Sequence, residues 1–224
     1  MKESVLIVGA GMGLSASLAH LCKSKGMKVV LAARDIEKLK KLKKETSADT
    51  IKCDATNIKS VENLFKKTDK IIGVPNLVIY NPSKSLGGNI GDINPKKAHE
   101  AINVTCYGGF LIAQQAAKRM LKKKRGSIFF TGATASVKGF SKSSVFAMGK
   151  FGLRGLAQSL ARELHPQNIH IGHFIIDGGI GRENYGSYKT IHPDSIAKTY
   201  LQFHYQDKSA WSWETQLRTS VEKF

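Results

Sequence analysis

Cysteine is scarce in this sequence, which has three cysteines in 224 residues. Cys22, Cys53 and Cys106 are odd in number and widely spaced, and they match neither a disulfide framework nor a metal-ligand pattern. The seven histidines include no H-E-x-x-H arrangement, which would place two zinc ligands on one helix face. We therefore expect no metal site, and reduced thiols in a cytoplasmic protein.

Long apolar runs are also missing. No run approaches the roughly 20 residues that a helix needs to cross a bilayer. The sequence starts with a strand-length apolar run that stops at Gly9, which is too short for a signal peptide. No linker, repeat or low-complexity tract divides the chain. These absences predict a single domain over residues 1–224 and no membrane segment.

Acidic residues are outnumbered, with 17 Asp and Glu against 35 Lys and Arg, and the formal net charge is +18. Such a charge is compatible with binding to nucleic acid or anionic lipid. However, the lysines of 38–44 lie opposite Leu39 and Leu42 on a predicted helix, and 122–125 closes another helix, where cations complement the dipole. No nucleic-acid motif accompanies either run, so solvated helix faces are preferred and a polyanion site stays an alternative.

Short apolar runs alternate with segments of helical period along the whole chain. Continuous apolar strands separated by helices indicate a parallel sheet that is covered on both faces. The sequence therefore predicts a doubly wound, Rossmann-type α/β fold with about seven strands. Strands are expected at 5–8, 29–33, 50–53, 77–80, 127–131, 169–176 and within 210–218, and helices at 13–25, 35–46, 57–67, 95–122, 143–164 and after Pro193.

Glycines lie between the first predicted strand and the first predicted helix. Gly9, Gly11 and Gly13, with Met12 and Leu14, form a tight turn that opens a helix. Such a turn lets the backbone approach a pyrophosphate, and the helix N-terminus adds free N–H groups and positive partial charge. The spacing is not the plain G-x-G-x-x-G fingerprint, so a glycine turn without a ligand is the alternative.

The end of the second strand indicates which dinucleotide would bind. Ala33 stands where NAD-binding proteins carry an acidic residue, and Arg34 follows it. An arginine here suits the 2′-phosphate of NADP, so NADP(H) is favoured over NAD(H). The alternative is that Arg34 is solvated, and Asp35 is expected to cap the next helix rather than bind ribose.

Later segments resemble the short-chain dehydrogenase/reductase family, and the resemblance covers nearly the whole chain. The most specific stretch, from Phe146 to Leu164, is similar to the family's Tyr-x-x-x-Lys helix and keeps the lysine as Lys150. Thr131-Gly132-Ala133 is similar to the segment that ends in the catalytic serine. The tail over 210–218 and the incomplete glycine motif resemble an atypical subgroup that has Phe in place of the catalytic Tyr.

The resemblance implies roles for residues along the strand ends. Lys150 would bind the nicotinamide ribose and Asn103 would support a proton-relay water, so these two are the catalytic candidates. Asp54 would lie near the adenine, and Ile180 would face the nicotinamide carboxamide. The cofactor-binding candidates are Gly9, Gly11, Met12, Gly13, Leu14, Arg34, Asp54, Ala55, Asn81, Lys150, Gly178 and Ile180.

Two groups of the family mechanism are missing, since Phe146 and Ala133 occupy the places of the catalytic Tyr and Ser. Losing a general acid costs on the order of 10²–10⁴ in rate, and losing an oxyanion donor costs a comparable factor. Three explanations stay open: a substrate such as an iminium that needs little protonation, another proton donor, or cofactor binding without turnover. The candidate donors are Thr134, Ser143, Ser144, Tyr185 and Tyr188.

We expect an NADP(H)-dependent oxidoreductase with an atypical active site. Its small-molecule substrate is not identified by the sequence, and a loop near 181–192 would cover it. The rival interpretation is a non-catalytic NADP(H)-binding sensor or subunit on the same fold. The resemblance also implies a homodimer or homotetramer built on the helices at 95–122 and 143–164.

Overall fold

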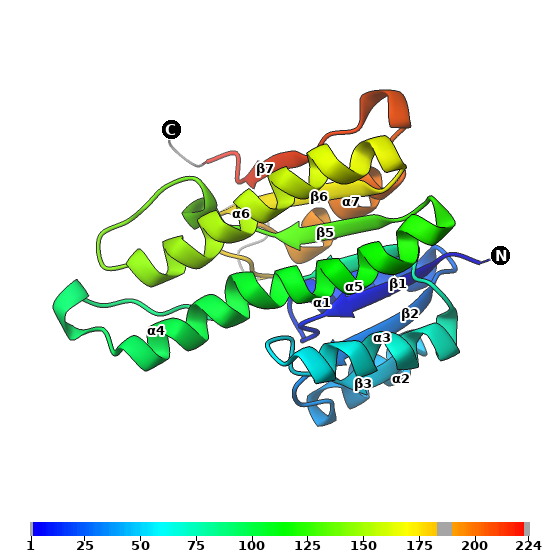
Figure 1. The fold of residues 1–224 in the computed structure, drawn as a ribbon, viewed down its shortest axis with the longest axis horizontal. Helices are drawn as coiled ribbons and strands as arrows, with labels where there is room; N and C mark the ends of the chain where they lie inside the picture. Colours follow the sequence, from blue (N-terminus) through cyan, green and yellow to red (C-terminus); the bar gives the residue numbers. More distant parts are fainter. Residues whose placement is uncertain (1, 183–189, 222–224) are drawn as a thin grey trace.

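The computed structural model describes residues 2–182 and 190–221. One parallel sheet of seven strands forms its centre, in the order β3-β2-β1-β4-β5-β6-β7 (Figure 1). This arrangement confirms the predicted doubly wound fold. The strands are β1 (Ser4–Val8), β2 (Lys28–Ala33), β3 (Asp49–Lys52), β4 (Leu77–Tyr80), β5 (Ser127–Thr131), β6 (His170–Asp177) and β7 (Glu214–Arg218).

Helices cover both faces of the sheet, and a separate hydrophobic core lies under each layer. The helices α1, α2 and α7 pack on one face, and α3, α5 and α6 pack on the other (Figure 1). The helices are α1 (Leu14–Ser24), α2 (Lys40–Thr46), α3 (Ile58–Ile72), α4 (Pro95–Ile102), α5 (Gly108–Lys123), α6 (Ser144–Leu164) and α7 (Pro193–His204). No helix in the described ranges is apolar over a length that would span a bilayer.

Three predicted elements differ in detail from the structure. The helix predicted at 95–122 consists of α4 and α5, joined by a π-helical segment over Asn103–Tyr107. The helix predicted at 35–46 starts as a 3₁₀ turn (Glu37–Leu39) before α2. The helix predicted at 57–67 has Asn57 as its N-cap and continues to Ile72. Hydrophobic period does not register such changes, because α, 3₁₀ and π turns place apolar residues on one face over short distances.

The seventh strand is shorter than predicted, and the tryptophan pair precedes it. β7 starts at Glu214, so Trp211 and Trp213 lie before the strand, although the range predicted to contain it, 210–218, includes both. Trp211 stacks on the ring of His170 at a centroid distance of 4.5 Å, and its Nε1 donates to the carbonyl of Gln206. These contacts make the partly buried Trp211 part of the packing around the start of β6.

The strand order creates a crevice at one position along the sheet. β1 lies between β2 and β4, and the chain turns to opposite faces after β1 and after β4. Connections that diverge at neighbouring strands leave an opening at their carboxyl ends, where ligands bind in open α/β sheets. The glycine turn at residues 9–13 follows β1 and therefore lies at this opening.

Candidate cofactor-binding and active site

The first glycine of the turn has a backbone conformation that only glycine adopts without strain. Gly9 has φ of +78°, and a Cβ built on it would lie 2.7 Å from the ring atoms of Pro82. The N–H groups of Gly9 and Ala10 both donate to the carbonyl of Ala32, at 2.9 and 3.0 Å. The turn is therefore held against β2 and against the segment after β4.

The N-terminus of α1 faces open space in front of this turn. Gly13 is its N-cap and provides no side-chain hydrogen bond, and a Cβ built on Gly11 or Gly13 would meet no atom within 4 Å. Leu14 itself is buried in the core, so its backbone N–H is the group it presents at the helix start. An uncapped helix N-terminus with free N–H groups and a positive dipole end is suited to bind a phosphate.

Ser15 is the second residue of α1, and its side chain connects the glycine turn to the end of β4. Its Oγ donates to the carbonyl of Gly9 at 3.2 Å and accepts from the amide of Asn81 at 2.8 Å. The backbone N–H of Asn81 donates to the carbonyl of Val8 at 3.0 Å. Asn81 was predicted as a cofactor ligand, and its amide here connects the end of β4 to the glycine turn. The sequence carried no signal for this long-range bond.

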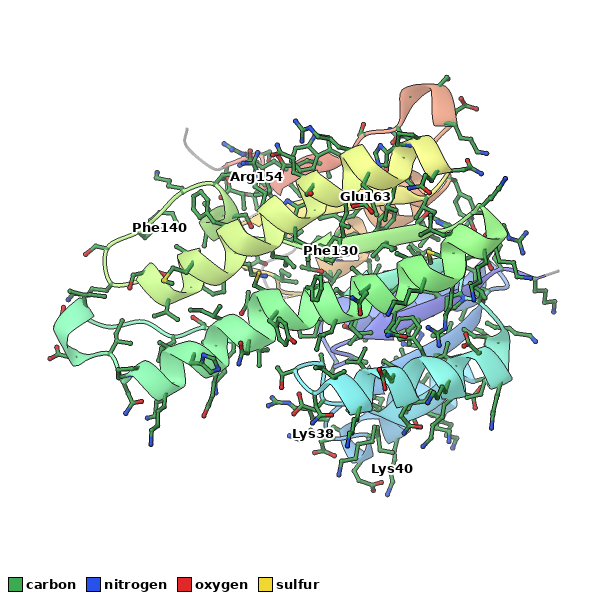
Figure 2. The ribbon with its side chains drawn as sticks, in the orientation of Figure 1. Lys38, Lys40, Phe130, Phe140, Arg154 and Glu163 are labelled. Carbon is green, nitrogen blue, oxygen red and sulfur yellow. The ribbon has the colours of Figure 1, made fainter. Side chains whose placement is uncertain are left out.

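A cleft of about 490 Å³ extends from the glycine turn across the ends of β2, β3 and β4. The predicted cofactor-binding residues that line it are Gly9, Gly11, Met12, Arg34, Asp54, Ala55 and Asn81. Lys38 also lines this cleft, although its spacing from Leu39 and Leu42 predicts only a place on a solvated helix face. Figure 2 shows Lys38 at the end of the molecule that carries the helices α2 and α3. Its position three residues after Asp35 could have indicated from the sequence that Lys38 lies beside the end of β2.

The far rim of the cleft is cationic. Arg34 and Lys38 both line it, and the amine of Lys38 lies 3.6 Å from Asp35 Oδ2. Asp35 Oδ1 accepts from the N–H of Glu37 at 3.1 Å. The expectation that Asp35 is the helix cap is wrong in position, because the N-cap of this 3₁₀ turn is Ile36 and that of α2 is Leu39. Arg34 and Lys38 carry two positive charges, and Asp35 carries one negative charge. The rim is therefore net positive, which suits a phosphate group.

Asp54 is held in a fixed orientation at the end of β3. Its Oδ1 accepts from the N–H and the Oγ1 of Thr56, at 2.9 and 2.8 Å. Its own N–H donates to Ser60 Oγ at 3.0 Å. The carboxylate therefore lies on the cleft wall without rotating freely, and it can accept a hydrogen bond from an exocyclic amine.

Lys150 lies outside the residues that line this cleft. The residue is 3% exposed, and its Nζ donates to the carbonyl of Thr131 at 2.7 Å. Burial lowers the pKa of Lys150 to about 8. The Nζ lies 5.7 Å from the ring centroid of Phe146, so the aromatic ring covers the amine from one side. The lysine in this state is directed at β5 rather than at the glycine turn.

The other predicted residues of the reaction end occupy separate positions. Asn103 begins the π-helical segment, and its Nδ2 lies 2.9 Å from His99 Nε2. Thr134, a candidate proton donor, donates a hydrogen bond from its hydroxyl to Asp177 Oδ1 at 2.6 Å. Ser143 precedes α6 as its N-cap without a side-chain hydrogen bond. The candidates Tyr185 and Tyr188 lie outside the described residues.

The two ends of the predicted substrate loop meet after β6. Gly178 has φ of +150°, and Ile180, 42% exposed, forms a bridge with Ile191. Gly181 N–H donates to the carbonyl of Ile191, and Ile191 N–H donates to the carbonyl of Gly179. Most of the loop predicted at 181–192 lies outside the described residues. Over 2–182 and 190–221, no group of His, Cys, Asp or Glu is arranged to bind a metal ion.

Comparison with known proteins agrees with this geometry. A family model described as short chain dehydrogenase matches residues 3–180. The chain is 25% identical to the 3-oxoacyl-[acyl-carrier-protein] reductase of Bos taurus over 173 residues, 76% of this chain and 73% of that protein. A short-chain dehydrogenase structure from Rhodopseudomonas palustris has a TM-score of 0.86 at 33% identity, covering 96% and 98% of the two chains. A metagenomic short-chain oxidoreductase in complex with NADP has a TM-score of 0.86 at 23% identity, covering 98% of both chains, and shows the shared fold.

Proposed function

The chain belongs to the short-chain dehydrogenase family, and from this premise we propose that it is an NADP(H)-dependent oxidoreductase whose active site works without the usual Ser and Tyr. That it is an oxidoreductase of this family follows from its relatives, which include a 3-oxoacyl-[acyl-carrier-protein] reductase. The cofactor preference and the atypical chemistry are the proposed part. The rival interpretation, a binding protein without turnover, gains no support from relatives that are named reductases.

One observation carries the cofactor assignment: the cleft combines an uncapped helix N-terminus at one end with two cations at the other. Phosphate groups fit both places, and NADP(H) has a diphosphate and a 2′-phosphate while NAD(H) lacks the second. The open space in front of Gly11 and Gly13 leaves room for a bound group. Arg34 and Lys38 would then hold the 2′-phosphate, and Asp54 would accept from the adenine amine.

The remaining assigned residues would hold the dinucleotide along its length. The turn residues Gly9, Gly11, Met12, Gly13 and Leu14 would contact the diphosphate through their backbone, and Ala55 and Asn81 would flank the adenosine. Lys150 would hold the ribose at the nicotinamide end, with Gly178 and Ile180 beside the ring. For Lys150 this requires a turn of its side chain away from the carbonyl of Thr131.

The bound cofactor would supply or accept the hydride, and side chains of the protein would supply or accept the proton. Phe146 has no proton to give, and Ala133 has no hydroxyl to position a carbonyl. The amine of Lys150 is the ionisable group nearest to Phe146 that the family mechanism retains, and its lowered pKa brings it close to neutral pH. We therefore favour a small carbonyl, imine or activated-alkene substrate that needs modest proton donation.

The exposed faces of the long helices suit a homodimer or homotetramer. Tyr107, Phe110, Met148 and Phe151 are large apolar residues on the π segment, α5 and α6, and all are at least 39% exposed. Exposed apolar residues gathered on paired helices are typical of a subunit interface.

The test is turnover with the reduced cofactor. Absorbance of NADPH would be followed with a panel of carbonyl, imine and activated-alkene compounds. The proposal expects consumption of NADPH with at least one class, and it fails if NADPH binds but no class is reduced. Arg34→Met with Lys38→Met should weaken NADPH binding on the order of ten- to hundredfold and leave NADH nearly unchanged. Lys41→Met is the matched control, since Lys41 lies on α2, directly after the 3₁₀ turn that carries Lys38, and does not line the cleft.

A further inference from the structure

A small pocket lies at the edge of the sheet where the strands start, opposite the cofactor cleft, and has no role in the function proposed above. Its volume is about 160 Å³, and its walls include Ser4 at the start of β1 and Asn76 directly before β4. The N–H and Oγ of Ser4 both donate to Asn76 Oδ1 at 3.1 Å, and the N–H of Ser127 on β5 donates to the carbonyl of Asn76 at 2.8 Å. These bonds join three strand starts, so the wall of this strand-start pocket is held in place.

Three cations line the strand-start pocket. Lys2 precedes β1, Lys123 is the last residue of α5, and Arg125 lies in the loop between α5 and β5. Figure 1 shows the N-terminus beside the end of α5. The walls contain no Asp or Glu from the described part of the chain, and none of the three cations forms an ion pair within residues 2–182 and 190–221. Three positive charges therefore border one small space without a counter-charge.

The carboxylates closest in sequence to the pocket are bound elsewhere. Glu3 Oε2 accepts from the hydroxyl of Tyr205 at 2.6 Å, and Glu3 Oε1 lies 3.5 Å from His204 Nε2. Asp69 Oδ2, on α3, accepts from Arg119 Nε at 2.8 Å, and Asp69 Oδ1 is buried. Neither carboxylate lines the pocket, so neither neutralises its cations.

Helix dipoles do not account for all of this charge. The C-terminal ends of α3 and α5 lie at this edge, and each carries roughly half a negative charge, together about one. The last turns of these helices already contain Lys70 in α3 and Lys122 in α5. Lys2 and Arg125 belong to neither helix. The cations that line the pocket are therefore in excess of what the dipoles need.

Neutral donors are also available in the pocket wall. Because Asn76 Oδ1 accepts from Ser4, Nδ2 is the donor end of the amide, and it has no hydrogen-bond partner within 2–182 and 190–221. The backbone N–H of Val74, another wall residue, has no partner in the same ranges either. Amines, a guanidinium and amide N–H groups are the donors that phosphate oxygens accept from.

The size of the pocket limits the ligand to a small group. A volume of 160 Å³ corresponds to about five water molecules at about 30 Å³ each, whereas the cofactor cleft has 490 Å³. This space suits one phosphate group and is too small to enclose a nucleotide.

We propose that the strand-start pocket binds a phosphate group, as inorganic phosphate or as the end of a phosphorylated small molecule. Lys2, Lys123 and Arg125 would balance its charge, and the amides of Val74 and Asn76 would donate to its oxygens. The bound group would connect the start of β1 to the ends of α3 and α5, and by mass action it would stabilise the folded chain. The pocket lies at the opposite edge from the glycine turn, so the inference does not depend on the function proposed above.

Nuclear magnetic resonance of the ¹⁵N-labelled wild-type protein provides the test, with inorganic phosphate as the probe. Sodium chloride would keep the ionic strength constant during the titration, because general screening also moves signals of charged surfaces. The signals of Val74 N–H, Asn76 Nδ2–H₂ and Arg125 Nε–H should shift together and saturate at millimolar phosphate. Shifts that do not saturate, or equal shifts when chloride replaces phosphate, overturn the proposal.

Matched double variants assign the effect to this pocket. Lys123→Met with Arg125→Met should weaken phosphate binding about tenfold or more. Lys118→Met with Lys122→Met removes the same charge from α5 outside the pocket and should leave the affinity within about twofold of the wild type. Equal weakening by both pairs contradicts a built site. Should a variant not fold, the wild-type titration still decides.

Two further arms of the experiment separate this pocket from the cofactor cleft and identify the source of the phosphate. Arg34→Met with Lys38→Met should leave the shifts at Val74 and Asn76 unchanged, and their loss would contradict the proposal. Glycerol 3-phosphate would be titrated in parallel with inorganic phosphate. Tighter binding of glycerol 3-phosphate indicates a phosphorylated small molecule, and tighter binding of inorganic phosphate indicates the free ion.

Discussion

The buried histidines predict a specific loss of stability in mild acid. His170 and His173 are 1% and 0% exposed, and burial lowers the pKa of each to about 4. In the unfolded chain a histidine titrates near 6.5. Between these two values the unfolded chain binds more protons than the folded protein, so the free energy of unfolding falls as the pH falls. This contribution is complete above pH 6.5 and is lost progressively toward pH 4.

The size of the effect follows from the shifts. A pKa lowered from 6.5 to about 4 corresponds to about 3 kcal/mol for each histidine, at 1.36 kcal/mol per pKa unit. The pair is then worth about 6 kcal/mol, comparable with the whole stability of many domains. His165 and His204 also have lowered pKa values because of burial, so they act in the same direction. We expect unfolding in urea to become markedly easier from pH 7 to pH 5.

The assay is urea unfolding followed by circular dichroism at several pH values from 8 to 4.5. Each histidine that charges on unfolding adds about 1.36 kcal/mol per pH unit to the slope. His170→Phe retains the stack on Trp211 but loses the hydrogen bond to the carbonyl of Ser212. It should cost about 1 kcal/mol at pH 8 and reduce the slope by about one proton.

The control for this experiment is Trp211→Phe. It weakens the same ring stack and leaves the histidine in place, so stability should fall at every pH with no change of slope. A wild-type slope below one proton between pH 6.5 and 4.5 would refute the reasoning, as would an unchanged slope in His170→Phe.

Three further substitutions test the glycine turn and the reaction end. Gly9→Ala would place a methyl group 2.7 Å from the ring of Pro82 at φ of +78°, so NADPH affinity should fall at least tenfold in a fluorescence titration. Gly11→Ala has open space around the new methyl group, so this variant should fold normally in a thermal melt. Ser15→Gly should cost about 2–3 kcal/mol in urea unfolding, because two hydrogen bonds are lost and glycine is unfavourable in a helix. Ala133→Ser combined with Phe146→Tyr should create or raise carbonyl reduction by on the order of 10²-fold or more in an NADPH absorbance assay, and no gain with any carbonyl would contradict an otherwise intact active site.

The sequence predicted the sheet well because its strands carry local signals. β1, β4 and β5 are continuous apolar runs that end at glycine, asparagine or threonine-glycine, and such runs have the same meaning wherever they lie in the chain. The glycine turn and Arg34 were found for the same reason, since each is recognisable from its place after a strand. These features are short-range, and the fold brings them to one cleft.

Features that depend on distant contacts were not predictable. Ser15 bonds Asn81 across 66 residues, and His173 meets Glu214 across 41, and neither spacing forms a motif. The Lys150 side chain is buried between α6 and β5, and its amine points to the carbonyl of Thr131. The i,i+4 spacing from Phe146 does not predict this direction. The assignments of individual residues to the cofactor stay predictions.

Binding of the two nicotinamide dinucleotides to the wild-type protein tests the central claim most directly. NADPH and NADH would each be titrated into the purified chain, with the fluorescence of the reduced nicotinamide and the heat of binding as readouts. A cleft with an uncapped helix N-terminus and two rim cations predicts saturable NADPH binding at least tenfold tighter than NADH binding. Binding of neither dinucleotide at millimolar concentration would contradict the claim that this cleft holds the cofactor.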